Sequence, residues 1–258
     1  MLIEYKIMKE HIAVVTLNRP KVSNALSTQL IRAINHTFEK IAKNPSIYCT
    51  IITGAQDKAF CAGADLKERL KMTEKQVVET VREIGKMISH IEQLPIPVIA
   101  ALNGAAFGGG LELALACDLR IAADHIKVGL TETSLGIIPG AGGTQRLPRL
   151  IGTGQAKRLI YTAQPIGAEE ALQIGLVEKI VKSTDLLNEA IKLAEIIASN
   201  GPIAIRQAKI AIDLGMKTDL AMGLSVEHES YLQTIHTEDR LEGLRAFQEK
   251  RRPHYKGK

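Results

Sequence analysis

Two glutamates and two glycine-containing loops are the residues of this chain best suited to chemistry. Glu112 follows the triple glycine Gly108–Gly110 and begins an apolar helical pattern, and Glu132 lies twenty residues further on, between two apolar segments. Two carboxylates in apolar surroundings can divide acid and base work, because their environments move their pKa values apart. A chain with 28 acidic residues would also contain such a pair by chance, so spacing alone leaves both interpretations open.

The glycines next to Glu112 predict a hydrogen-bond donor. The first N–H groups of a helix have no partner within the helix, and glycine lets a ligand approach the backbone closely. The N–H of Gly109 is therefore suited to stabilise negative charge on an oxygen atom, and the helix dipole is expected to keep Glu112 ionised. The loop Cys61–Asp65 (CAGAD) also precedes a predicted helix and offers a second donor of this kind. Tight helix packing is the structural alternative for the three glycines.

The elements that must position these loops form an α/β pattern. The run Val98–Leu102 has the length and composition of a buried strand, and it breaks at Asn103–Gly104. Further strands are predicted at 2–7, 12–18, 48–53, 119–122, 128–130 and 177–181, and helices follow the expected caps Ser27 and Thr73.

The C-terminal part of the chain has a different pattern. After about residue 184 only helices are expected, at 184–199, 202–214, 219–233 and 238–250. We therefore predict a core of strand–strand–helix (ββα) units over residues 1–195 and an all-helical region over residues 196–258.

Composition excludes several classes of protein. Cys49, Cys61 and Cys117 are too few for a disulfide framework and are expected to be buried, and the seven histidines show no zinc-like spacing, so no metal is predicted. No apolar run approaches the ~18 residues that span a membrane, and Met1–Glu4 do not resemble a signal peptide, so we expect a cytoplasmic protein. The motifs of P-loop NTPases, dinucleotide-binding dehydrogenases, zinc proteases and serine hydrolases are absent.

Charge suggests an anionic ligand. The formal net charge is +5 with a pI near 9.0, which suits substrates that carry phosphates. Lys67, Lys71 and Lys75, at i, i+4 and i+8, predict a basic stripe on one helical face, for contact with phosphates or RNA or merely with solvent. Only 3% of the residues are aromatic and none is Trp, which makes nucleic-acid binding the weaker hypothesis.

Several motifs in the same order resemble the enoyl-CoA hydratase (crotonase) superfamily. The resemblance extends from about residue 5 to the C-terminus. The motifs that carry it are LNRP at 17–20, FCAGADLK at 60–67, PVIAA at 97–101, GGGLELA at 108–114, CD at 117–118 and LGIIPGAGGTQRL at 135–147.

The resemblance implies a fold, a ligand and a set of roles. The fold would be a spiral of ββα units with a C-terminal helical region that builds homotrimers, often paired into hexamers. The ligand would be an acyl-CoA thioester, with no cofactor beyond the CoA of the substrate. The N–H groups of Ala64 and Gly109 would form an oxyanion hole for the thioester oxygen. The CoA site would be lined by the residues Ala62, Ala64, Asp65, Leu66, Lys67 and Gly109.

Within this superfamily, hydratases carry two glutamates, at positions that match Glu112 and Glu132, whereas isomerases typically keep one. The chain therefore resembles a hydratase, which would add water to a 2-enoyl-CoA in β-oxidation or branched-chain degradation. Residues 62–69, 136–139 and 239–244 resemble methylglutaconyl-CoA hydratases as well as short-chain enoyl-CoA hydratases. A methylglutaconyl group would require a cation or donor deep in the acyl pocket, which sequence does not identify. An enoyl-CoA isomerase and an RNA-binding protein remain the alternative functions.

Overall fold

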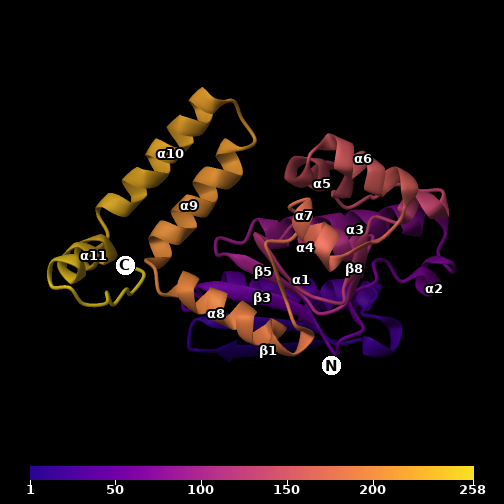
Figure 1. The fold of residues 1–258 in the computed structure, drawn as a ribbon, viewed down its shortest axis with the longest axis horizontal. Helices are drawn as coiled ribbons and strands as arrows, with labels where there is room; N and C mark the ends of the chain where they lie inside the picture. The colour runs from indigo at the N-terminus through magenta and orange to yellow at the C-terminus, as the bar shows by residue number, and fades with distance from the viewer.

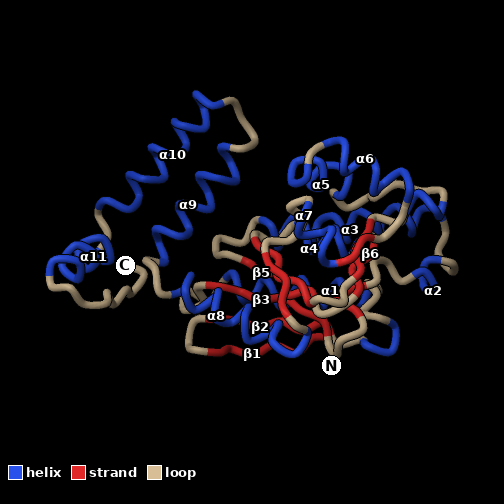
Figure 2. Tube along the Cα trace, in the orientation of Figure 1, coloured by secondary structure: helices blue, strands red, loops and turns tan.

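Ten strands form two sheets in the computed structural model, which describes residues 1–258 (Figure 2). The larger sheet has the strand order β1-β2-β3-β5-β7-β10. Only its first pair is antiparallel, and the remaining neighbours run parallel. Its strands are β1 (Ile3–Met8), β2 (Ile12–Leu17), β3 (Cys49–Gly54), β5 (Val98–Leu102), β7 (Leu119–Ala123) and β10 (Lys179–Val181).

The smaller sheet contains the strands nearest the glycine loops, in the order β4-β6-β8-β9. Its first three strands pair in parallel. The sequence did not predict β6, because three residues (AAF) give no periodic signal. The strands are β4 (Ala59–Cys61), β6 (Ala105–Phe107), β8 (Lys127–Gly129) and β9 (Ile166–Gly167).

Each strand of the larger sheet from β3 to β7 is followed by a strand of the smaller one. The chain passes from β3 to β4, from β5 to β6 and from β7 to β8, and a helix follows each pair. Asn103 fixes one of these passages, since its side chain accepts from the N–H of Gly54 at 2.8 Å and donates to the carbonyl of Gln56 at 2.6 Å. This succession confirms the predicted crotonase-like α/β spiral of ββα units.

Helices cover both sheets (Figure 1). The predicted caps are confirmed: Ser27 accepts from the N–H of Leu30, and Thr73 with Gln76 forms both bonds of a capping box. The last core helix, α8, packs on β3 and β5, and its buried residues are Leu186, Ala190, Ile191 and Ala194. The core helices are α1 (Thr28–Ala42), α2 (Leu66–Arg69), α3 (Glu74–Glu92), α4 (Gly109–Leu115), α5 (Gly143–Ile151), α6 (Thr153–Thr162), α7 (Ala168–Gln173) and α8 (Leu186–Ala198).

The C-terminal helices extend away from this core. Figure 1 shows α9 (Pro202–Gly215) and α10 (Leu220–Ile235) as a hairpin at a distance from the sheets, followed by α11 (Glu238–Gln248). Because α8 ends at Ala198 and packs on the sheet, the chain leaves the core close to the predicted border at residue 195. The division into two regions stays a prediction. No helix is long and apolar enough to cross a bilayer.

The backbone of α4 touches β4 at Gly110. A Cβ atom at this position would lie only 2.0 Å from the carbonyl oxygen of Cys61. The contact joins the two glycine loops directly, because Cys61 begins the loop that contains Ala64, and Gly110 follows Gly109. The glycines thus do permit close packing, as the structural alternative held, and this packing also sets the distance between the two predicted donors.

We expect Gly110→Ala to destabilise the protein by roughly 2–4 kcal/mol, because neither backbone can move away without disturbing the sheet. Gly154→Ala is the matched control, since it also lies in a helix but has no atom within 4 Å of the new Cβ. The control should be neutral or slightly stabilising. Urea unfolding of both variants measures the difference, and equal stability of the two would contradict this account of the contact.

Candidate active site

A cavity of about 490 Å³ lies where the glycine loops, α3 and the loop before α5 meet. It contains both predicted acids, Glu112 and Glu132, and both predicted donors, Ala64 and Gly109. Most of the remaining wall is apolar. The other lining residues are Ala62, Gly63, Leu66, Arg69, Val77, Val81, Ile84, Gly108, Thr131, Leu135, Ile137, Ile138, Gly140 and Ala141.

The N–H groups of Ala64 and Gly109 have no acceptor within the protein. Leu26 pairs with the residues on either side of Ala64, donating to the Gly63 carbonyl and accepting from the Asp65 N–H. Because successive backbone groups of an extended segment point in opposite directions, the Ala64 N–H faces away from Leu26. Gly109 is the first residue of α4, so its N–H has no partner in the helix.

Glycine at position 63 allows these two donors to approach each other. Its φ of +86° lies in the left-handed region, and a Cβ atom there would be 2.7 Å from the carbonyl oxygen of Phe107 and 3.1 Å from the nitrogen of Gly109. A Cβ atom at Gly109 would lie 3.8 Å from the nitrogen of Ala64. The two free N–H groups thus lie on closely packed backbone segments, an arrangement suited to the oxyanion hole that the family resemblance implies.

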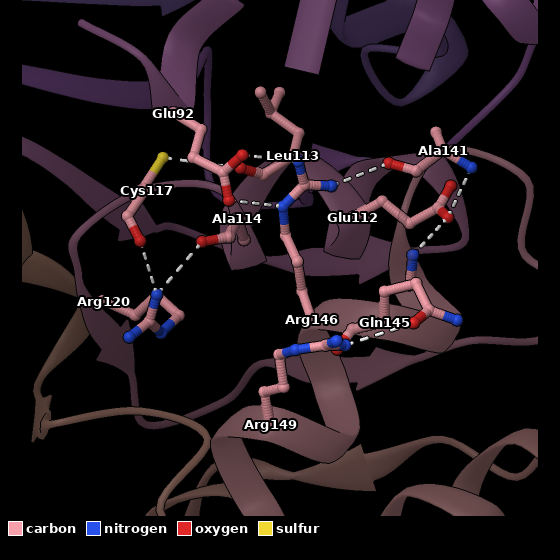
Figure 3. A network of polar contacts seen from close by, with 11 residues as sticks. Glu92, Glu112, Leu113, Ala114, Cys117, Arg120, Ala141, Gln145, Arg146 and Arg149 are labelled. Carbon is pink, nitrogen blue, oxygen red and sulfur yellow. Dashed lines mark hydrogen bonds and ion pairs between the residues drawn. The ribbon is translucent and has the colours of Figure 1, made fainter. Parts of the chain in front are cut away.

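Glu112 is buried, with only 2% of its surface exposed. One carboxylate oxygen accepts from the N–H groups of Ala141 and Gly143, both at 2.8 Å (Figure 3). Burial raises the pKa of Glu112, while these two hydrogen bonds and the charge of Arg146 act in the opposite direction. The sequence attributed the state of this acid to the helix dipole. Its contacts instead lie in the loop before α5, and the net shift of the pKa is upward.

Arg146 holds that loop in place. Its guanidinium binds both carboxylate oxygens of Glu92 at 2.9 Å and donates to the carbonyl of Ala141 at 3.0 Å (Figure 3). Gly143 is equally constrained, because a Cβ atom there would lie 3.0 Å from the Glu112 carboxylate. The loop can therefore present two N–H groups to Glu112 without a side chain between them.

Glu132 begins a short 3-10 helix, Glu132–Leu135, and also lines the cavity. Its Oε2 atom is buried and has no hydrogen-bond partner. Burial raises the pKa of this carboxyl to about 7, and the charge of Glu112 acts in the same direction. At neutral pH, Glu132 is thus close to half protonated and can donate a proton.

Some predicted CoA-site residues face the cavity and others do not. Ala62 and Leu66 line it, whereas the carboxylate of Asp65 caps α2 by accepting from the Glu68 N–H and pairs with Arg19 at 3.1 Å. Lys67 is exposed and is not part of the cavity wall.

The predicted stripe of three lysines on one helical face is wrong. Helix α2 ends at Arg69, so Lys71 lies in a turn and Lys75 belongs to α3. The three charges do not continue along one helix, because the Thr73 capping box starts a new one. The cysteines, in contrast, are all buried and free, as predicted.

Several residues of the site were not predicted from the sequence. The Ile137–Gly143 loop was recognised as rich in glycine and proline, but its contact with Glu112 joins residues 29 and 31 positions apart. Arg146 and Glu92 are likewise distant in sequence. Arg69 gave no signal beyond a charged residue near a helix end, although its side chain lines the cavity.

A ββα spiral with two acids and a pair of free N–H groups in one cavity defines a crotonase-type protein. Residues 8–258 match the family described as enoyl-CoA hydratase/isomerase, and the chain belongs to that family. It is similar to an enoyl-CoA hydratase from Bacillus anthracis, whose crystal structure superimposes with a TM-score of 0.99, at 53% identity and full coverage of both chains. The methylglutaconyl-CoA hydratase of Mus musculus is 47% identical over 95% of this chain and 80% of its own length. The short-chain-enoyl-CoA hydratase of Clostridium acetobutylicum is 45% identical over 93% of this chain and 92% of its own.

The raised pKa of Glu132 predicts a pH-dependent stability. A carboxyl whose folded-state pKa exceeds its unfolded value opposes folding once it ionises, so its unfavourable contribution is absent below about pH 4.5 and complete above about pH 7. We expect Glu132→Gln to stabilise the protein at pH 8 by roughly 1–2 kcal/mol, allowing for solvent screening, and to have little effect at pH 4.5. Denaturant unfolding at both pH values measures this. Glu79→Gln, an exposed acid of α3, is the control, and a pH-independent effect of Glu132→Gln would contradict the assignment.

Proposed function

We propose that this protein is a 2-enoyl-CoA hydratase, which adds water reversibly across the 2,3 double bond of an acyl-CoA thioester to give a 3-hydroxyacyl-CoA. The observation that carries the proposal is the position of Glu112 and Glu132 in the same cavity as the two free N–H groups of Ala64 and Gly109. The relatives that are named hydratases support it.

The N–H groups act on the thioester. Conjugate addition of water to C3 shifts electron density to the thioester oxygen, which acquires the charge of an enolate. Two N–H groups in a largely apolar cavity stabilise that charge more strongly than water does, because they are already oriented. We propose that Ala62, Leu66 and Lys67 contact the CoA portion, with the exposed ammonium of Lys67 towards the phosphates.

The two acids divide the proton transfers. Glu112 has two N–H groups on its carboxylate, which favour its charged form, and it orients the water and takes its proton as the oxygen attacks C3. Glu132, with a pKa near 7, delivers a proton to C2. The net reaction is addition of H and OH to one face of the double bond. The proton that Glu112 takes from water then replaces the proton that Glu132 has given to C2. This chemistry requires only acids, a base and N–H donors, so we propose that no metal or redox cofactor takes part.

Hydration is favoured over isomerisation because both acids are present. Moving a proton from C2 to C4 needs a single base, whereas hydration uses one group for water and another for C2. A 3-enoyl-CoA turned over faster than crotonyl-CoA would support an isomerase instead.

We also propose that the protein forms a homotrimer, or a hexamer of two trimers. Large apolar side chains are exposed on the helical hairpin α9–α10, which suits burial against other copies. These side chains include Ile212, Met216, Leu220, Met222 and Leu224.

Replacement of either acid should abolish most hydration of crotonyl-CoA. We expect Glu112→Gln and Glu132→Gln each to lower kcat on the order of 10²–10⁴-fold, the usual effect of losing a positioned acid or base. Loss of absorbance of crotonyl-CoA measures the rate, and Glu79→Gln is the control that should retain it. A wild-type protein without hydratase activity, or full activity in both variants, would refute the proposal.

The pKa of Glu132 also predicts a pH profile. Hydration needs Glu132 protonated and Glu112 ionised, so kcat/KM should fall as pH rises through about 7 and fall again in acid. Dehydration of the hydroxyacyl-CoA should show the same bell shape, because the equilibrium constant of the reaction does not change with pH. Initial rates in both directions between pH 5 and 9 test this. An activity that keeps rising above pH 8 would mean that Glu132 is not the acid.

A further inference from the structure

Arg69 is a cavity residue to which the hydratase reaction above gives no role. It is the last residue of α2, and its side chain lines the cavity that contains the two acids. Its guanidinium donates no hydrogen bond to the protein and forms no ion pair, and its Nε atom is buried without a partner. A buried donor without an acceptor is unfavourable, so this group is suited to a ligand that supplies one.

The surroundings of Arg69 indicate the kind of ligand. No other cation lines the cavity, and the charge of Arg69 lowers the pKa of Glu132 although the two side chains form no ion pair. Much of the cavity wall is apolar, with Val77 and Val81 from α3, Leu135 from the 3-10 helix and Ile137 from the loop after it. A hydrocarbon acyl chain would fill these walls but leave the guanidinium unpaired. A carboxylate would satisfy it, because the planar guanidinium matches a carboxylate with two parallel hydrogen bonds.

The location of Arg69 indicates which anion of an acyl-CoA would reach it, a phosphate of CoA or a carboxylate on the acyl group. Arg69 lines the same cavity as Glu112 and Glu132, together with apolar residues of α3, whereas Lys67, which we propose for the phosphates, is exposed and lies outside the cavity wall. The phosphates lie beyond the long pantetheine arm, on the other side of the thioester. The anion that meets Arg69 therefore belongs to the acyl group.

We propose that Arg69 selects 2-enoyl-CoA substrates whose acyl group ends in a carboxylate, as in glutaconyl-CoA. The inference rests on the proposed hydratase function and adds a substrate class and a specificity residue to it. Arg69 pairs with the substrate carboxylate and compensates its repulsion by the charge of Glu112, which lines the same cavity. An uncharged acyl group of equal length gains nothing from this contact.

The test compares two substrates that differ by the carboxylate, glutaconyl-CoA and crotonyl-CoA. The wild-type protein should hydrate glutaconyl-CoA with the higher kcat/KM. Arg69→Met should lower kcat/KM for glutaconyl-CoA on the order of 10²-fold and change that for crotonyl-CoA only a few-fold. Arg69→Lys should restore part of the preference, since it keeps the charge but not the planar fork.

The control is Arg82→Met, which removes an exposed arginine of α3 without a salt bridge and should leave the ratio of the two substrates unchanged. An equal fall for both substrates in Arg69→Met would overturn the inference, because Arg69 would then act only through the pKa of Glu132. A wild-type ratio at or below one would overturn it as well. Absence of hydration of either substrate by the wild-type protein would instead refute the hydratase function itself. Unfolding curves of the variants distinguish lost specificity from lost structure.

Discussion

The burial of the Glu112 carboxylate is the constraint on which the rest of the site depends. A charged group with 2% exposure is tolerated only where hydrogen bonds replace water, and here two backbone N–H groups do so. Those N–H groups point inward because Gly143 has no side chain and Arg146 ties the loop to Glu92. Glu112 lies in the first turn of α4, the helix whose first N–H group, that of Gly109, is the predicted donor. One carboxylate thus connects the loop before α5 to the start of α4.

Glu132 shows what the same cavity does to an acid without such partners. Its Oε2 atom has no donor, and its pKa rises to about 7 mainly through burial. Glu112 and Glu132 are chemically identical side chains in one cavity, and they differ in their burial, hydrogen bonds and neighbouring charges. The roles proposed for the two acids, base for Glu112 and acid for Glu132, therefore depend in part on where the N–H groups lie.

Local patterns predicted most of the fold and part of the site. Ser27 and Thr73 predicted their helices, because a cap is a contact between residues three apart in sequence. The donor at Gly109 and a donor loop at Cys61–Asp65 were predicted from glycines next to helix starts. The resemblance to a known family singled out Ala64 in that loop and paired it with Gly109. The contacts of Glu112 with residues 141 and 143, and the contact of Gly110 with Cys61, depend on how distant segments meet. The periodicity of apolar residues along the sequence does not reveal such long-range contacts. The lysine stripe failed for a local reason, since the spacing of Lys67, Lys71 and Lys75 assumes one helix where the Thr73 cap starts a second.

The site separates the chemistry of the reaction from the choice of substrate by using different parts of the chain for each. In the proposed mechanism the thioester contacts backbone N–H groups, which substitution of a side chain cannot remove, and the close contact of Gly110 with Cys61 joins the two segments that carry them. The acyl group would contact side chains that line the cavity from helices and loops, among them Arg69, Val77 and Ile137. Changing one of these alters the charge or volume offered to the acyl chain, while the donors and their glycines stay in place. Such an arrangement would allow one backbone geometry to activate many thioesters. Arg69, the single cation of the cavity wall, would then have the strongest influence on which acyl group is accepted.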